Sequence, residues 1–182
     1  MSVFSNSATS TPTEIREYVA AVLDLLGDRD PIAVLGATPG RLEEAIRGAA
    51  AAALRTPEAG GKWSIAQVLQ HLADSELVWA WRLRLTLAQD RPPLTGYDQD
   101  AWASRLHYAD ADPRQALDLF SVVRRANLTV LAAAAPEDLQ RVAVHSERGE
   151  QTLDVMVRMY AGHDLLHINQ IDRIKAAVSN RS

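Results

Sequence analysis

The amino-acid sequence predicts an all-α protein: a four-helix bundle with an extra N-terminal helix and one long crossover loop. Four long segments repeat apolar residues at spacings of three and four, as amphipathic helices do. Helix-capping signals precede most of these segments. No convincing run of alternating polar and apolar residues indicates a strand, although residues 142–144 could pair locally. Together these patterns indicate a helical bundle around one core of inward-facing residues.

The first two predicted helices follow proline-containing start signals. Thr11, with proline next and glutamate three residues on, predicts a capping box for a helix that reaches about Leu26. A short apolar connector is expected over 32–35. Thr38 and the proline after it then predict the start of a second helix over 40–54, whose alanine-rich end favours helix and close packing.

The later helices are longer. A capping box at Ser64 predicts a helix to about Gln89, and further caps predict helices over 112–134 and 152–178. Residues 90–112 form the long polar and aromatic crossover loop. Loops of this length inside compact domains are more often functional than idle.

Length, charge and cysteine content limit the function classes. The 182 residues suit one domain, expected over 11–182, after a polar and flexible N-terminus over 1–10. A net charge of −4 argues against nucleic acid as the main partner. No cysteine is present, so any metal ligands must be nitrogen or oxygen. The N-terminus resembles neither a signal peptide nor a membrane anchor, and we expect a soluble, cytoplasmic protein.

Two histidines lie four residues apart within the apolar stripe of the last predicted helix. Four residues advance a helix by about 6 Å and return to nearly the same face, so the rings of His163 and His167 point the same way. Inward imidazoles need polar partners, and one metal ion would satisfy both. The alternative is a pair of ordinary core histidines, because the spacing also arises by chance.

A third histidine, His71, lies at the edge of the apolar stripe of the helix predicted from Ser64. A bundle can bring it level with the other two histidines. Three nitrogen ligands leave a position open, as catalytic metal sites do, whereas structural zinc sites have four protein ligands. A ferritin-like di-iron centre is disfavoured, because it needs two Glu-x-x-His elements and the nearest match, 164–167, begins with aspartate.

Four sequence blocks together resemble the DinB/YfiT-like family of metalloenzymes, and most closely its YfiT branch, which resembles bacillithiol transferases. The blocks are GKWSIAQVLQHLADSE at 61–76, YDQDAW at 97–102, HSERGEQTL at 145–153 and YAGHDLLH at 160–167. The resemblance implies a four-helix bundle, often dimeric, with a divalent metal on three histidines that fall here on His71, His163 and His167. One departure is Glu76, where that branch often has histidine.

The resemblance also implies a range of activities. The family includes S-transferases that use low-molecular-weight thiols such as bacillithiol or mycothiol, an isomerase, and members without an assigned activity. We therefore expect a metal-dependent S-transferase or hydrolase acting on a small molecule, with a low-molecular-weight thiol as possible cosubstrate. Zinc or nickel is the expected metal, with iron or manganese as alternatives, and a homodimer is expected. The alternative function is a non-catalytic metal-binding or stress-associated dimeric bundle.

Further site residues are predicted near the histidines. Asp74 and Asp164 are the acids nearest the ligands in sequence and are candidate catalytic partners of a ligand histidine; the alternative is a surface ion pair. Arg82, on the same side of its helix as His71, is a candidate for binding an anionic substrate; the alternative is an ordinary surface arginine. His107 and His145 are not predicted as ligands.

The crossover loop supplies the other predicted substrate-binding residues. Tyr97, Asp98 and Trp102 are expected to form a lid over the site; the alternative is a packed loop with exposed acids. Trp79 and Trp81 cannot share a helix face, so one is expected in the core and the other at the surface, at a subunit contact.

Overall fold

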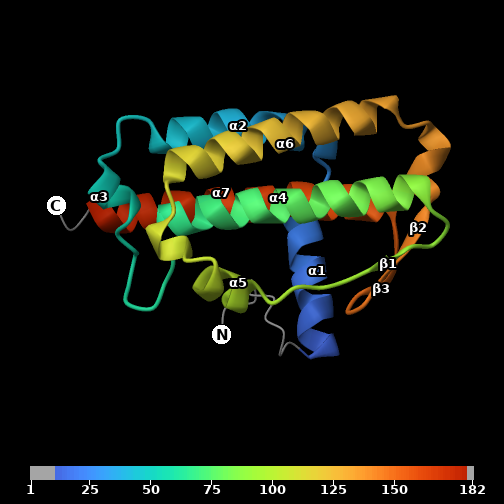
Figure 1. Ribbon diagram of the computed structural model, residues 1–182, viewed down its shortest axis with the longest axis horizontal. Helices are drawn as coiled ribbons and strands as arrows, with labels where there is room; N and C mark the ends of the chain where they lie inside the picture. Colours follow the sequence, from blue (N-terminus) through green and yellow to red (C-terminus); the bar gives the residue numbers. More distant parts are fainter. Residues whose placement is uncertain (1–10, 180–182) are drawn as a thin grey trace.

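The computed structural model describes residues 11–179, so the flexible N-terminus predicted over 1–10 lies outside the described residues. Four long helices run side by side (Figure 1): α2 (Pro31–Ile46), α4 (Ile65–Ala88), α6 (Pro113–Ala133) and α7 (Leu153–Ser179). Helix α4 packs along α6, and α2 packs against both α6 and α7. The predicted all-α bundle is confirmed. No described helix is long and apolar enough to cross a membrane.

The extra N-terminal helix, α1 (Pro12–Leu26), is also confirmed, and it runs across the bundle against α7 (Figure 1). Its predicted capping box forms between Thr11 and Glu14. The crossing requires glycine on α7, because a Cβ added at Gly162 would lie 2.1 Å from the backbone oxygen of Val22. The helix therefore approaches α7 directly beside the first histidine of the predicted pair.

The predicted boundaries of the second helix are wrong. Helix α2 begins at Pro31, capped by Asp30, and continues through Pro39 to Ile46; residues 47–50 separate it from the short α3 (Ala51–Leu54). The expected connector at 32–35 is therefore helical. Proline is tolerated inside α2 because the carbonyl of Leu35, which loses its usual helical donor, accepts a bond from an arginine side chain of α6.

Three short strands lie at one end of the bundle. Strand β2 (Val142–His145) pairs antiparallel with β3 (Gly149–Thr152) and parallel with β1 (Pro93–Leu94). Local pairing at 142–144 was predicted, whereas β1 was not, because two residues carry no detectable alternation. The sheet ties the crossover loop to the turn before α7, so two segments that are distant in sequence meet beside the bundle (Figure 1).

The crossover segment carries structure of its own. Besides β1 it contains α5 (Gln99–Arg105) and the 3-10 turn η1 (Tyr108–Asp110), and a second 3-10 turn, η2 (Pro136–Gln140), follows α6. The predicted split of the tryptophans on α4 is confirmed, since Trp79 is fully buried and Trp81 is 64% exposed.

Candidate metal centre

Three histidine rings converge at the middle of the bundle. His71 comes from α4, and His163 and His167 come from successive turns of α7. The Nε2 atom of His163 lies 3.2 Å from Nε2 of His71 and 3.1 Å from Nε2 of His167. All three ligand atoms lie within 4.8 Å of one another. The structure thus brings together the three residues that the sequence singled out.

The spacing of these nitrogens fits one metal ion. Two nitrogens on a tetrahedral zinc, each at its usual bond length, stand about 3.3 Å apart. Three imidazole nitrogens that face one another compete for protons, whereas a metal ion accepts a lone pair from each of them. The donor set, three neutral nitrogens without thiolate or carboxylate, suits zinc, nickel, copper or iron.

Burial keeps the three rings neutral, as metal ligands must be. It lowers the pKa of His71 and His163 well below the usual value, and the neighbouring histidines lower the pKa of both further. Burial lowers the pKa of His167 to about 4. His167 also has its tautomer fixed: Nδ1 donates to Gln170 Oε1 at 2.7 Å, which leaves the Nε2 lone pair free for a metal.

A cavity of about 70 Å³ lies beside the cluster, with His71 and His163 in its wall. This volume holds roughly five water-sized groups. The wall is built by α1, α4, the loop after β1, the start of α5, the end of β2, the β2–β3 turn and α7. Besides the two histidines it contains Tyr18, Ser75, Arg82, Gly96, Tyr97, Gln99, His145, Glu147, Arg148, Met159 and Tyr160. The histidine cluster therefore opens onto a space that a small molecule can enter.

A short hydrogen-bonded chain connects the crossover loop to the cluster. Ser75 Oγ lies 3.4 Å from His71 Nε2 and 2.8 Å from the Tyr97 hydroxyl. Burial raises the pKa of Tyr97 to about 12, so its hydroxyl keeps its proton at neutral pH. Serine and tyrosine thus place two neutral hydroxyls beside the open side of the three nitrogens.

The other residues of the predicted lid lie further away. Asp98 accepts hydrogen bonds from the backbone N–H groups of Asp100 and Ala101 and caps α5. Trp102 packs against the Tyr97 ring, with 4.5 Å between the ring centroids, and is not part of the cavity wall. Of the three residues, only Tyr97 reaches the cavity.

The two predicted acids hydrogen-bond to groups other than the histidines. Asp74 accepts from the Tyr108 hydroxyl at 2.6 Å and from Gln70 at 3.1 Å. Asp164 is paired with Arg124. Both carboxylates are buried, so neither forms the surface ion pair considered as the alternative. Their catalytic role stays a prediction.

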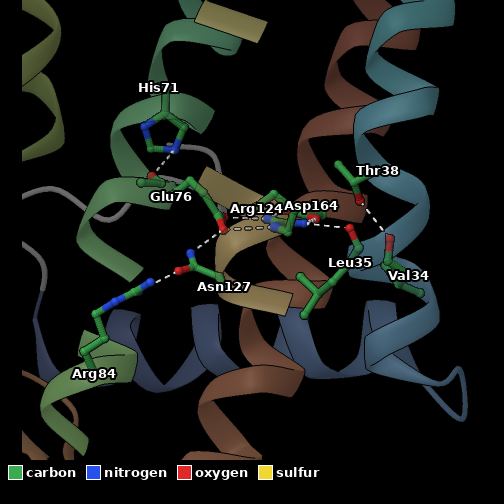
Figure 2. A network of polar contacts seen from close by, with 10 residues as sticks. Val34, Leu35, Thr38, His71, Glu76, Arg84, Arg124, Asn127 and Asp164 are labelled. Atoms are coloured by element: carbon green, nitrogen blue, oxygen red, sulfur yellow. Dashed lines mark hydrogen bonds and ion pairs between the residues drawn. The ribbon is translucent and has the colours of Figure 1, made fainter. Parts of the chain in front are cut away.

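Behind the cluster lies a buried ion network that the sequence reasoning missed (Figure 2). Arg124 of α6 donates to Glu76 Oε2 at 2.7 Å and to Asp164 Oδ1 at 3.1 Å, and Asn127 donates to Glu76 Oε1 at 2.7 Å. Both acids and the arginine are 1% exposed. A signal was present: Arg124 follows Phe120 by four residues in the apolar stripe of α6, where a charge needs buried partners.

Two arginines also line the cavity. They are Arg82 of α4, which is 5% exposed, and Arg148 from the β2–β3 turn; the substrate-binding role of Arg82 stays a prediction. His145, which the sequence reasoning set aside, is 2% exposed and lines the same cavity. His107 is exposed and does not line this cavity; it precedes η1 in a left-handed backbone conformation.

The sequence profile of the DinB superfamily matches residues 35–171, which contain the three clustered histidines, His71, His163 and His167. The chain belongs to the DinB superfamily. It is 29% identical over 144 residues to "Putative metal-dependent hydrolase YfiT" of Bacillus subtilis, covering 79% of this chain and 81% of that protein. A protein of Oceanobacillus iheyensis with the same functional description is 29% identical over 118 residues, covering 65% of this chain and 68% of the relative.

A solved structure agrees with both fold and family. The structure of YfiT from Bacillus subtilis matches with a TM-score of 0.72 at 28% identity, covering 79% of this chain and 84% of that one. It is described as "a probable metal-dependent hydrolase with an unusual four-helix bundle topology". The DinB family and the bundle expected from the sequence are thereby confirmed.

Proposed function

We propose that this DinB-superfamily protein is a metal-dependent enzyme that carries out S-transfer or hydrolysis on a small molecule. One observation carries the proposal: three neutral Nε2 atoms converge at metal-binding distance, and two of the three histidines line a cavity. His71, His163 and His167 would hold the ion, and zinc or nickel is the expected metal. A divalent ion so held acts as a Lewis acid and activates a bound water or thiol.

The side chains around the cluster suit this chemistry. Three protein ligands from two helices would leave a coordination position for a substrate or water, unlike a closed structural site with four protein ligands. Ser75 and Tyr97 place hydroxyls there that donate to or accept from a substrate atom. The chain has no cysteine, so a thiol nucleophile has to come from a cosubstrate. The names of the relatives support hydrolysis, and the resemblance to bacillithiol transferases supports S-transfer.

The first experiment is elemental analysis of freshly purified protein. We expect about one divalent ion per chain in the wild type and almost none in His163→Ala/His167→Ala. His107→Ala is the matched control, because this exposed histidine lies outside the cluster and its loss should leave metal content unchanged. Full metal retention in the double variant would refute the site.

Activity is tested next on metal-loaded protein. S-transfer from bacillithiol to a small electrophile and hydrolysis of small esters and amides are measured in parallel. We expect one of the two activities in the wild type and in His107→Ala, and neither in the double variant. A metal-loaded wild type that is inactive in both screens would favour the non-catalytic bundle.

A further inference from the structure

The cavity wall contains a buried guanidinium that forms no ion pair with a carboxylate of the described residues. Arg82 is 5% exposed, yet its hydrogen bonds go to neutral oxygens: the backbone carbonyl of Thr95 at 2.6 Å and the Tyr160 hydroxyl at 3.3 Å. No ion pair links it to a carboxylate within residues 11–179. Buried guanidinium groups are normally paired, because an uncompensated charge is costly away from water.

A second guanidinium lies in the same wall. Arg148 donates from Nε to Gln151 Oε1 at 3.0 Å, and its terminal nitrogens make no hydrogen bond to any residue of the described chain. Arg82 and Arg148 repel one another, which lowers the pKa of Arg148 beyond the effect of burial. One carboxylate, Glu147, also lines the cavity, so two positive charges face one negative charge before any metal binds.

His145 adds a hydrogen-bond donor whose partner is missing. The backbone N–H of Glu147 donates to His145 Nδ1 at 3.1 Å, so a neutral ring carries its proton on Nε2. Burial and the two arginines lower the pKa of His145 to about 3, and the ring is therefore neutral. Its Nε2 is buried and has no hydrogen-bond partner among the described residues. An unused donor in a cavity wall indicates an acceptor on a ligand.

We propose that Arg82, Arg148 and His145 form a subsite for a substrate carboxylate, and that the reacting group of this substrate is directed toward the histidine cluster, two members of which line the same cavity. Guanidinium donors match the planar carboxylate, and the limited volume favours a short carboxylic acid. This inference rests on the proposed function and narrows its substrate class to small anionic molecules.

Binding of a matched pair of thiols tests the subsite. We would titrate cobalt-loaded protein with 3-mercaptopropionate and with 3-mercapto-1-propanol, which differ only in the carboxylate, by calorimetry and by thiolate-to-cobalt absorption. The subsite predicts that the acid binds about ten- to a hundredfold more tightly. Arg148→Met and His145→Phe should each remove most of this preference. Arg125→Met, an exposed arginine of α6, should retain it.

Several outcomes separate the possibilities. Equal affinities of wild type for both thiols, or a preference that survives in both variants, would overturn the subsite. Cobalt content measured in each sample separates this result from failure of the metal site. Propionate and 1-propanol, titrated into metal-free protein, test the subsite without any metal. Binding heat from propionate but not from 1-propanol, lost in Arg148→Met and in His145→Phe, supports the subsite. Equal binding heats from propionate and 1-propanol contradict it.

The same experiment identifies which reactant carries the carboxylate. If propionate still binds when cobalt protein is saturated with 3-mercapto-1-propanol, the carboxylate belongs to the second substrate. If the cobalt protein saturated with 3-mercapto-1-propanol does not bind propionate, and 3-mercaptopropionate alone still binds more tightly than 3-mercapto-1-propanol, the carboxylate belongs to the thiol. Circular dichroism of each variant verifies that the bundle is folded.

Discussion

Replacing Arg124 by methionine should destabilise the protein severely, because the change leaves two buried carboxylates without their counter-charge. Arg124, Glu76 and Asp164 are each 1% exposed, and the arginine also bonds the Leu35 carbonyl freed by Pro39 (Figure 2). The guanidinium group lies over the Phe120 ring, 4.6 Å from its centroid. Removing one partner of a buried ion pair costs about 3–5 kcal/mol. For a chain of this length that corresponds to a fall in Tm of about 6–20 °C.

Urea unfolding of metal-free protein, followed by circular dichroism, measures the loss. The neighbouring Arg125→Met is the control: this side chain is exposed, and its replacement should change the free energy of unfolding by less than about 0.5 kcal/mol. Adding Glu76→Gln to Arg124→Met should restore part of the stability, because it removes one of the two uncompensated charges. Equal unfolding free energies for the two methionine variants would show that the network contributes nothing.

Three further outcomes are expected. Gly162→Ala should destabilise the protein by about 1–3 kcal/mol in urea unfolding, because the new Cβ would meet the backbone of α1. The control Gly36→Ala has open space around its Cβ and should be neutral or stabilising. Similar effects of the two substitutions would contradict the close crossing of α1 and α7. When the pH is lowered from 6.5 to 5, the free energy of unfolding of metal-free protein should fall by about 2 kcal/mol for each of His145 and His167. Their pKa values, about 3 and about 4, lie below that of an unfolded histidine, so the unfolded chain binds more protons in this window. A free energy of unfolding that does not change over this range would refute the neutral rings. Zinc or nickel at a hundred times its Kd should raise the free energy of unfolding by about 2.7 kcal/mol in the wild type and leave His163→Ala/His167→Ala unchanged, as thermal melts will show.

The sequence indicated the three histidines that converge in the structure, because their signals are local and chemically specific. His163 and His167 repeat at helical spacing on an apolar face, and His71 lies at the edge of the apolar stripe of a distant helix. The family resemblance implied the same three residues. Helix starts at Thr11 and Ser64 were found for the same reason, since a capping box acts within four residues.

The features that the sequence did not reveal depend on tertiary contacts. The start of α2 was misplaced because Pro39 suggested a break, and only the distant arginine that bonds Leu35 makes an interior proline tolerable. His145 was set aside because nothing local indicates that the β2–β3 turn closes over a cavity formed by α4 and α7. Asp164 was chosen for its nearness to His163, whereas its partner, Arg124, lies 40 residues away.

Helix α1 has a consequence for how related proteins diverge. The residues shared with the superfamily profile begin at 35, so this helix precedes them, yet its Tyr18 closes one side of the cavity. The bundle within the profile supplies the three histidines, and a helix that precedes the profile supplies part of the cavity wall. Substitutions on α1 can therefore change which molecules the cavity accepts while the three imidazoles remain untouched.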